Sequence, residues 1–249
     1  MKIIVCIKQI PDTKDVRWTK DNNIIREGLI SILNPYDLYA ILFAKKIKEQ
    51  IKNTEITLLS MGPNSASDSI EYGLAFNCDR GILLSDKRFS GADTLATAKT
   101  LKYAILNNIK TYDLILTGQF ALDGDTAQTS YNLANLLKIP HIGYVQDFEE
   151  IKENELVVKS VKDNGIYKIK TKTPVVISIS AFKDEIYIPK AIDYINAQKK
   201  EIQILSSADI NANLDEVGIK GSPTYVFKAF RPENKRECVF KNDLIGELN

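Results

Sequence analysis

The stretch Leu114–Gln128, LILTGQFALDGDTAQ, joins a short apolar run, a glycine-bearing loop and the start of a helical pattern. We predict that the helix begins at Thr126, with Asp125 as its N-cap and Gln128 at its third position. A helix start presents unpaired N–H groups and a partial positive charge, which favour a phosphate. Gly124 has no side chain to keep a ligand away from the backbone. We therefore expect a nucleotide to bind at this loop.

The loop does not establish a ligand site by itself. Many α/β proteins have a glycine-bearing turn before a capped helix that binds nothing. Asp123 and Asp125 would also repel a phosphate, unless their side chains point to a ribose or cap the helix. Both interpretations stay open until the neighbouring segments are considered.

The composition is that of an ordinary globular protein. A chain of 249 residues can bury a full core, and we predict a nucleotide-binding domain over 1–205 and a C-terminal arm over 206–249. The formal net charge of +1 gives no electrostatic reason to expect nucleic acid as a partner. No apolar run approaches the roughly 20 residues that span a bilayer, so we expect a cytoplasmic protein without membrane insertion.

Residues for acid–base or metal catalysis are scarce. His141 is the only histidine, which makes a zinc site or a hydrolytic triad hard to assemble. Its position after Pro140, at a helix exit, favours a structural role. Cys6, Cys78 and Cys238 lack metal-ligand spacing, and no Walker-type loop or G-x-G-x-x-G occurs. We predict no catalytic residue and no metal site, and we expect nucleotide binding or electron transfer.

The first 140 residues alternate apolar runs with helical patterns. The runs predicted as buried strands are 2–7, 55–60, 80–84 and 113–116. The predicted helix starts are Asn34 followed by Pro35, Ser65 with Asp68, and Ser90 with Asp93. This alternation predicts an α/β fold with a mostly parallel, doubly wound, Rossmann-like sheet covered by helices on both faces.

Ligands of such sheets bind at the carboxyl ends of the strands. The segments that follow the predicted strands are 6–8, 60–63, 84–86 and 118–125. The helix start at 34–37 can reach the same edge. Because several loops suited to an adenosine and its phosphates meet there, the sequence favours a nucleotide site over a loop that binds nothing.

The pattern changes after Pro140. Extended segments at 156–161 and 167–170 flank Asp163-Asn164-Gly165, a strong turn signal. Residues 175–179 form another apolar run typical of a buried strand. We predict that this part of the chain is an antiparallel extension of the sheet.

From Ser206 onward the chain is polar and rich in glycine and proline. Such a segment is either loosely ordered or folded over a partner. Phe227, Phe230 and Phe240 would be unusual in a disordered tail. We therefore predict that this C-terminal arm wraps a partner subunit.

Together, these segments resemble the beta subunit of electron transfer flavoprotein. The likeness extends over nearly the whole chain, from the strand at 2–8 to Thr224. The matching pieces are VCIKQIPD at 5–12, NPYD at 34–37, SMGP at 60–63, LSD at 84–86, GADTLAT at 91–97, DGDTAQ at 123–128 and GIKGSPT at 218–224. Each piece is weak alone, but their order and spacing make the resemblance specific.

The resemblance implies a subunit that pairs with an electron transfer flavoprotein alpha subunit and carries flavin electrons between dehydrogenases and acceptors. One branch of the family holds AMP in the beta subunit as a structural filler. The other holds a second FAD, used for flavin-based electron bifurcation with NADH. The AMP branch tends to have bulkier residues where Gly124 and Ala127 stand here. We therefore expect FAD, with AMP as the alternative and NADH as a transient electron donor.

The resemblance also implies which residues contact the nucleotide. They are Cys6, Asn34, Asp37, Met61, Thr94, Ala121, Leu122, Asp123, Gly124, Asp125, Thr126, Ala127, Gln128 and Thr129. Thr126, Gln128 and Thr129 can supply hydroxyl, amide and backbone donors to a pyrophosphate. Phe120 departs from the family, which usually has glutamine there, and this removes one polar contact near the nucleotide.

A second departure concerns the segment with which the family docks to dehydrogenases. It often reads Glu-Pro-Arg-Tyr-Pro-Ser-Leu, whereas residues 185–191 here read EIYIPKA. Ala191 thus replaces the leucine that inserts into the dehydrogenase, which puts an acyl-CoA dehydrogenase in question as a partner. A further alternative, from another class, is a stand-alone ATP- or AMP-binding regulatory protein, which would need no alpha chain.

Overall fold

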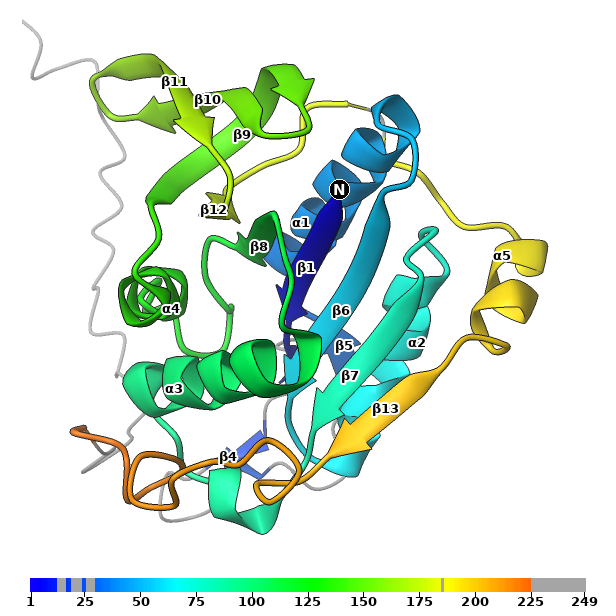
Figure 1. The fold of residues 1–249 in the computed structure, drawn as a ribbon. Coiled ribbons are helices and arrows are strands. Elements are labelled where there is room, and N and C mark those ends of the chain that lie inside the picture. Colours follow the sequence, from blue (N-terminus) through cyan, green and yellow to red (C-terminus); the bar gives the residue numbers. More distant parts are fainter. Residues whose placement is uncertain (13–16, 19–23, 26–29, 185, 225–249) are drawn as a thin grey trace, which may run out of the picture.

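A nine-stranded sheet forms the centre of the fold (Figure 1). The computed structural model describes residues 1–12, 17–18, 24–25, 30–184 and 186–224. The strands, in sheet order, are β11 (Gly165–Lys172), β10 (Glu155–Lys162), β9 (His141–Lys152), β12 (Val175–Ile179), β8 (Leu114–Gly118), β1 (Lys2–Ile7), β6 (Glu55–Met61), β7 (Arg80–Leu84) and β13 (Ile202–Leu205). Two small antiparallel pairs lie apart from it: β2 (Gln9–Pro11) with β5 (Ser31–Leu33), and β3 (Arg17–Trp18) with β4 (Ile24–Ile25).

The strands from β9 through β12 and β8 to β13 pair in parallel, whereas β10 and β11 pair antiparallel. This confirms the predicted mostly parallel sheet with an antiparallel extension. The run at 175–179 belongs to the parallel part, since β12 lies buried between β8 and β9. The chain proceeds from β1 to β6 and β7 on one side, and then returns to place β8 on the other side of β1. The winding direction therefore switches between β1 and β8.

Helices cover both faces of the sheet, as predicted. They are α1 (Pro35–Gln50), α2 (Ser67–Leu74), α3 (Thr94–Ala104), α4 (Thr129–Leu137) and α5 (Ala191–Ala197), with 3-10 turns η2 (Asn64–Ala66) and η3 (Lys87–Phe89) and a π-helical turn η4 (Ile105–Ile109). Figure 1 shows α3 and α4 in front of the sheet and α1 behind it. Alternate residues of β1 face opposite ways: Val5 packs in the core under α1, and Ile4 in the core under α3. Each face of the sheet thus has its own apolar core.

Three predicted helix starts differ from the structure. Asp93 caps α3 by accepting hydrogen bonds from two backbone N–H groups, so Ser90 is not the cap. Ser65 lies inside η2, and α2 begins after it. The last of the three, α4, begins at Thr129 rather than Thr126. Asp125 and Ala127 have φ values of 48° and 52°, which a right-handed helix does not allow.

Residues 206–224, here called the strap, lie along α3 (Figure 1, orange). Ile210 and Val217 of the strap are buried in the core on the α3 side of the sheet. This part of the predicted arm thus packs on its own chain. Phe227, Phe230, Phe240 and Cys238 lie outside the described residues, and the wrapping of a partner by the arm stays a prediction. Among the described residues, no helix has the length and apolarity needed to cross a membrane.

Lys200 closes the C-terminal end of α2. Its ammonium group donates to the carbonyl oxygens of Leu74 at 3.0 Å and Cys78 at 2.6 Å. A cation at a helix C-terminus also interacts favourably with the helix dipole. We expect Lys200→Met to lower the free energy of unfolding by about 1–2 kcal/mol, measured by urea denaturation, because both carbonyls lose a charged donor. Lys199→Met is the matched control, since Lys199 is exposed. Equal losses in the two variants would contradict this role.

Candidate functional site

The carboxyl ends of four parallel strands meet at one edge of the sheet. Pairing places Ile7 of β1 beside Ser60 of β6, and Met61 of β6 beside Leu84 of β7. On the other side, Cys6 of β1 pairs with Thr117 of β8. The predicted gathering of 6–8, 60–63, 84–86 and 118–125 at one edge is therefore confirmed. Since the winding switches between β1 and β8, a ligand crevice is expected there.

Asp37, in the first turn of α1, joins these two central strands. Its carboxylate accepts hydrogen bonds from the backbone N–H groups of Lys8, at 2.7 Å, and Gly118, at 3.1 Å. A Cβ added to Gly118 would lie 2.4 Å from Oδ1 of Asp37, so glycine is needed for this approach. The carboxylate is buried in these contacts. Asp37 therefore fixes the ends of β1 and β8 relative to α1.

Burial also changes the acidity of two side chains at this edge. It raises the pKa of Asp37 to about 7, although hydrogen bonds from Lys8, Asn34 and Gly118 oppose the shift. Burial, and secondarily the charge of Asp37, raises the pKa of the Cys6 thiol to about 12. A thiol of this kind stays protonated and is not a nucleophile. Cys6 can therefore form a wall of the site without reacting.

Asn34 was predicted to cap α1, and this prediction is wrong in its chemistry. Asn34 occupies the N-cap position, but its side chain makes no capping hydrogen bond. Its Nδ2 donates instead to the carbonyl oxygen of Phe120 at 2.9 Å, and its Oδ1 accepts from the N–H of Leu122 at 3.3 Å. The buried amide thus holds the start of residues 119–128, here called the β8–α4 loop. The Phe120 ring packs on Tyr36 with centroids 4.2 Å apart, so an aromatic contact fills this position.

The backbone N–H groups of the β8–α4 loop differ in their partners along the loop. The loop is a tight turn, because the N–H groups of Gly124 and Asp125 both donate to the carbonyl of Ala121. Beyond it, the N–H groups of 126–129 find no acceptor among the described residues. Left-handed backbone at Ala127 next to right-handed backbone at Gln128 aims successive N–H groups into one concavity. Such a concavity at the start of a helix suits a phosphate.

Gly124 is not required by the protein itself. A Cβ added there would meet no atom within 4 Å. Its φ also lies outside the left-handed region, in contrast to Gly91 and Gly218. Neither packing nor backbone conformation therefore explains a glycine at this position. The space beside this exposed backbone is open to a ligand.

Lys8 was not predicted as a site residue. Its ammonium group lies 2.8 and 2.7 Å from the two carboxylate oxygens of Asp123. With the two side chains 48% and 28% exposed, the pair adds little stability, but it neutralises an acid that would otherwise repel a phosphate. The sequence signal was a lysine directly after a buried strand, facing a loop that contains acids. The ion pair involves Asp123 and not Asp125, the other acid of the loop.

Thr94 connects the β8–α4 loop to α3. Its hydroxyl donates to Oε1 of Gln128 at 3.1 Å. This contact joins the elements that follow β7 and β8, across the ends of β1 and β6. The half-buried Met61 lies at the end of β6, in the same region. The predicted residues are thus brought to one edge, and their donors fit a phosphate-bearing group.

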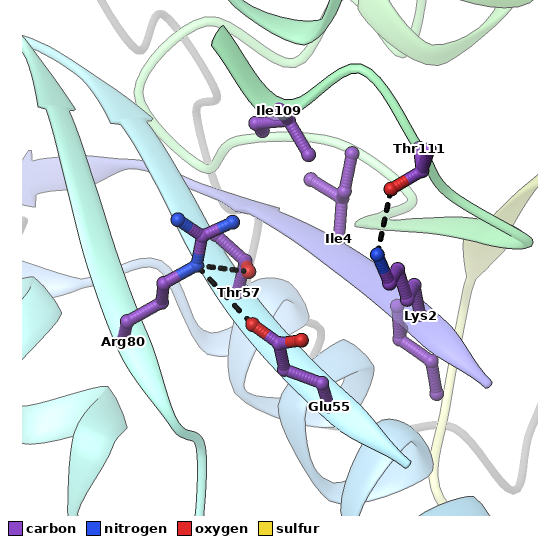
Figure 2. Close-up of a pocket in the computed structure, with 8 residues that line it drawn as sticks. Lys2, Ile4, Glu55, Thr57, Arg80, Ile109 and Thr111 are labelled. Atoms are coloured by element: carbon purple, nitrogen blue, oxygen red, sulfur yellow. Dashed lines mark hydrogen bonds and ion pairs between the residues drawn. The ribbon is translucent and has the colours of Figure 1, made fainter. Parts of the chain in front are cut away.

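A small pocket lies on the opposite side of the sheet, at the amino ends of the parallel strands (Figure 2). Its lining includes Lys2, Glu55, Thr57, Arg80 and Thr111. Figure 2 shows Arg80 directed at Glu55 and Thr57, and Lys2 directed at the hydroxyl of Thr111. The ammonium group of Lys2 donates to that hydroxyl at 2.8 Å. Because both cations already engage neighbouring side chains, this pocket is a weaker ligand site than the carboxyl edge. No cluster of residues suited to a metal ion occurs among the described residues.

His141 lies away from the carboxyl edge, at the start of β9. Its Nε2 is 3.2 Å from the hydroxyl of Ser130, and its ring packs on Tyr131 with centroids 3.9 Å apart. Burial lowers the pKa of the imidazole to about 4. These contacts support the predicted structural role.

The single histidine allows a direct test of this burial. We expect the imidazole C2–H signal in the proton NMR spectrum to keep its chemical shift from pH 8 down to about pH 5, because the ring stays neutral. The unfolded chain in urea should titrate near the ordinary pKa of 6.5. Because the folded pKa is depressed, the stability contributed by His141 is lost as the pH falls below about 6.5. A folded-state midpoint near 6.5 would show that the ring is not buried.

Sequence comparisons relate the chain to known proteins. The sequence profile of the family described as Electron transfer flavoprotein domain matches residues 21–210. The chain is 39% identical to the electron transfer flavoprotein subunit beta of Thermoanaerobacterium thermosaccharolyticum, over 95% of this chain and 90% of that protein. It is 37% identical to the subunit beta of Megasphaera elsdenii, over 94% and 89%. It is also 38% identical to the caffeyl-CoA reductase-Etf complex subunit CarD of Acetobacterium woodii, over 94% and 89%.

Proposed function

The chain belongs to the electron transfer flavoprotein family, and from this premise we propose that it is a beta subunit that holds FAD at the carboxyl edge of its sheet. It pairs with an alpha subunit and passes electrons through that subunit to other acceptors. NADH is the electron donor in this proposal, and the electrons divide by flavin-based bifurcation. The protein is cytoplasmic.

We base the choice of FAD over AMP on Gly124, a glycine that neither packing nor backbone conformation requires. A Cβ at Gly124 would meet no protein atom within 4 Å, so the free space beside the backbone is available to a ligand. A dinucleotide needs room for a second phosphate where a mononucleotide ends. The N–H groups of 126–129, which have no acceptor within the described part of the chain, supply donors for such a pyrophosphate.

Each residue group has a defined part in this function. The N–H groups of 126–129 bind the pyrophosphate, and Cys6 and Met61 form the walls beside the strand ends. Asn34 holds the β8–α4 loop, and Asp37 fixes the strands on which it stands. The bound flavin supplies the redox chemistry, while the chain supplies binding and orientation.

The proposal includes a dehydrogenase that docks near α5. Ala191, the first residue of α5, is exposed, and so are Ile188, Ile192 and Ile195, at 79%, 55% and 50%. Exposed apolar side chains of this kind mark protein interaction surfaces. They surround the position at which Ala191 replaces the leucine of the family, whereas Glu185 lies outside the described residues. The same surface leaves an acyl-CoA dehydrogenase as one candidate partner.

The test is the nucleotide content of the chain co-purified with its alpha subunit, determined by acid release and chromatography. Two FAD and no AMP per heterodimer is the expected result. One FAD and one AMP would show that the β8–α4 loop holds a mononucleotide and that the protein is a simple carrier. An adenine nucleotide held without flavin, by a chain that needs no alpha subunit, would instead indicate a regulatory protein.

A further inference from the structure

The strap is fastened to α3 at both ends. Near the C-terminal end of α3, Nδ2 of Asn107 donates to the carbonyl of Ile210 at 2.6 Å. Near the middle of the strap, the carboxylate of Glu216 accepts from the hydroxyl of Tyr103, in the last turn of α3. The strap ends at the N-terminus of α3, beside Asp93. Its last residues therefore reach the edge at which the β8–α4 loop lies.

Asp93 divides its two carboxylate oxygens between two tasks. Oδ1 caps α3 by accepting from the N–H groups of Leu95, at 3.0 Å, and Ala96, at 2.9 Å. Oδ2 accepts from the N–H of Thr224 at 3.2 Å and from its hydroxyl at 2.8 Å. The N–H of Asp93 donates in turn to the hydroxyl of Ser222 at 2.8 Å. One carboxylate thus ties the end of the strap to the start of the helix.

This junction is one residue away from the candidate nucleotide site. Thr94 follows Asp93 directly, and its hydroxyl donates to Gln128 at 3.1 Å. The N–H of Gln128 is one of the loop donors for which the residues that the structure describes offer no acceptor. A continuous set of contacts therefore runs from the strap through Asp93 and Thr94 to the loop.

We propose that Asp93 is a positioning residue of the nucleotide site, whose Oδ2 holds the strap against the start of α3 and thereby keeps Thr94 in contact with Gln128. This inference rests on the proposed function, because it requires a nucleotide at the β8–α4 loop. By thermodynamic linkage, a nucleotide that is held more tightly with the strap fastened must itself fasten the strap. The carboxylate keeps its charge at neutral pH: burial opposes ionisation, but hydrogen bonds from Ala96, Thr224 and Leu95 hold the pKa below its ordinary value.

Asp93→Asn separates the two tasks of the carboxylate. Asparagine is as good an N-cap as aspartate, so its side-chain oxygen can still accept from the N–H groups at the start of α3. Its NH₂ group cannot accept from Thr224, so the strap loses the contact to Oδ2, whereas the N–H of residue 93 can still donate to Ser222. Thr224→Val removes the hydroxyl from the other side of the same contact. The matched control is Asp209→Asn at the other end of the strap, where Oδ2 accepts from the N–H and hydroxyl of Ser206 at 2.8 and 2.6 Å.

The experiment uses the heterodimer and two readouts. The first is the rate at which bound adenine nucleotide is released, and the second is the rate of trypsin cleavage after the exposed Lys220 of the strap. Asp93→Asn and Thr224→Val should each release nucleotide about fivefold faster, the effect of one lost hydrogen bond of ordinary strength. Both should also be cleaved faster, whereas Asp209→Asn should behave as wild type. Nucleotide-loaded wild type should be cleaved more slowly than the nucleotide-depleted heterodimer.

Two results would overturn the inference. Faster cleavage of Asp93→Asn with an unchanged release rate would show that the strap does not act on the site. Unchanged cleavage would show that Oδ2 does not hold the strap. A wild-type heterodimer that contains no adenine nucleotide beyond that of its alpha subunit would instead contradict the proposed function, and this inference would fall with it.

Discussion

Between pH 5 and pH 8, the wild-type chain should lose about 2–3 kcal/mol of unfolding free energy relative to its Asp37→Asn variant. Burial raises the pKa of Asp37 from an ordinary 3.8 to about 7 in the folded chain. Between these values the folded state binds more protons than the unfolded state, so stability falls as the pH rises. The loss begins near pH 4 and is complete above about pH 7. Each unit of pKa difference corresponds to about 1.4 kcal/mol.

Urea denaturation of both proteins at pH 5, 6, 7 and 8 measures this difference. The comparison with asparagine isolates Asp37, because asparagine has a similar shape and does not titrate. Asp209→Asn is the control, since hydrogen bonds from Ser206 lower the pKa of Asp209 and its protonation is constant over this range. Parallel pH profiles for wild type and Asp37→Asn would contradict the prediction. They would mean that the N–H groups of Lys8 and Gly118 keep the buried carboxylate charged throughout.

The same protonation acts on the proposed site. Asp37 accepts from backbone groups of β1 and β8, the two strands at which the winding direction switches. A protonated carboxyl group is a weaker acceptor than a carboxylate. The stability and the geometry of the crevice are therefore linked: the chain is more stable when Asp37 is neutral, and the strand ends are held more tightly when it is charged.

The strands were predictable because their evidence is local. The runs at 2–7 and 80–84 are mostly apolar after a charged first residue, and the structure has β1 and β7 at these residues. The start of α4 was not predictable in this way. Asp125 and Gln128 have the spacing of a capping box, but left-handed backbone at Asp125 and Ala127 delays the helix to Thr129. The spacing of residues shows which side chains could cap a helix, but it does not show the backbone angles that decide where the helix begins.

The contacts that build the site were predictable only in part, because they are long-range. The family resemblance brought Asn34 to the site, but its hydrogen bonds reach Phe120, 86 positions along the chain. The ion pair of Lys8 with Asp123 spans 115 positions, and the hydrogen bond from Thr224 to Asp93 spans 131. No periodicity or capping rule relates residues so far apart. The same reason explains the strap, whose polar composition resembles a free tail although its buried residues pack beneath α3.

Gly124→Asp is expected to weaken FAD binding to the heterodimer about 5- to 150-fold, while AMP can still bind. A carboxylate at this position would stand beside the second phosphate of a dinucleotide. Two like charges about 5 Å apart near a protein surface repel each other by about 1–3 kcal/mol. The fold should be unaffected, because a Cβ at Gly124 meets no protein atom within 4 Å. The measurements are FAD and AMP stoichiometry after purification, FAD affinity by flavin fluorescence titration, and the thermal midpoint.

Gly124→Asn is the matched control, because asparagine has the size of aspartate without its charge. If repulsion dominates, Gly124→Asn should keep most of the FAD that Gly124→Asp loses. If space dominates, both variants should lose FAD to the same extent and take up AMP instead. Either result supports a ligand beside the glycine. Unchanged FAD content and affinity in both variants would place the pyrophosphate elsewhere and would contradict a role for Gly124 in FAD binding.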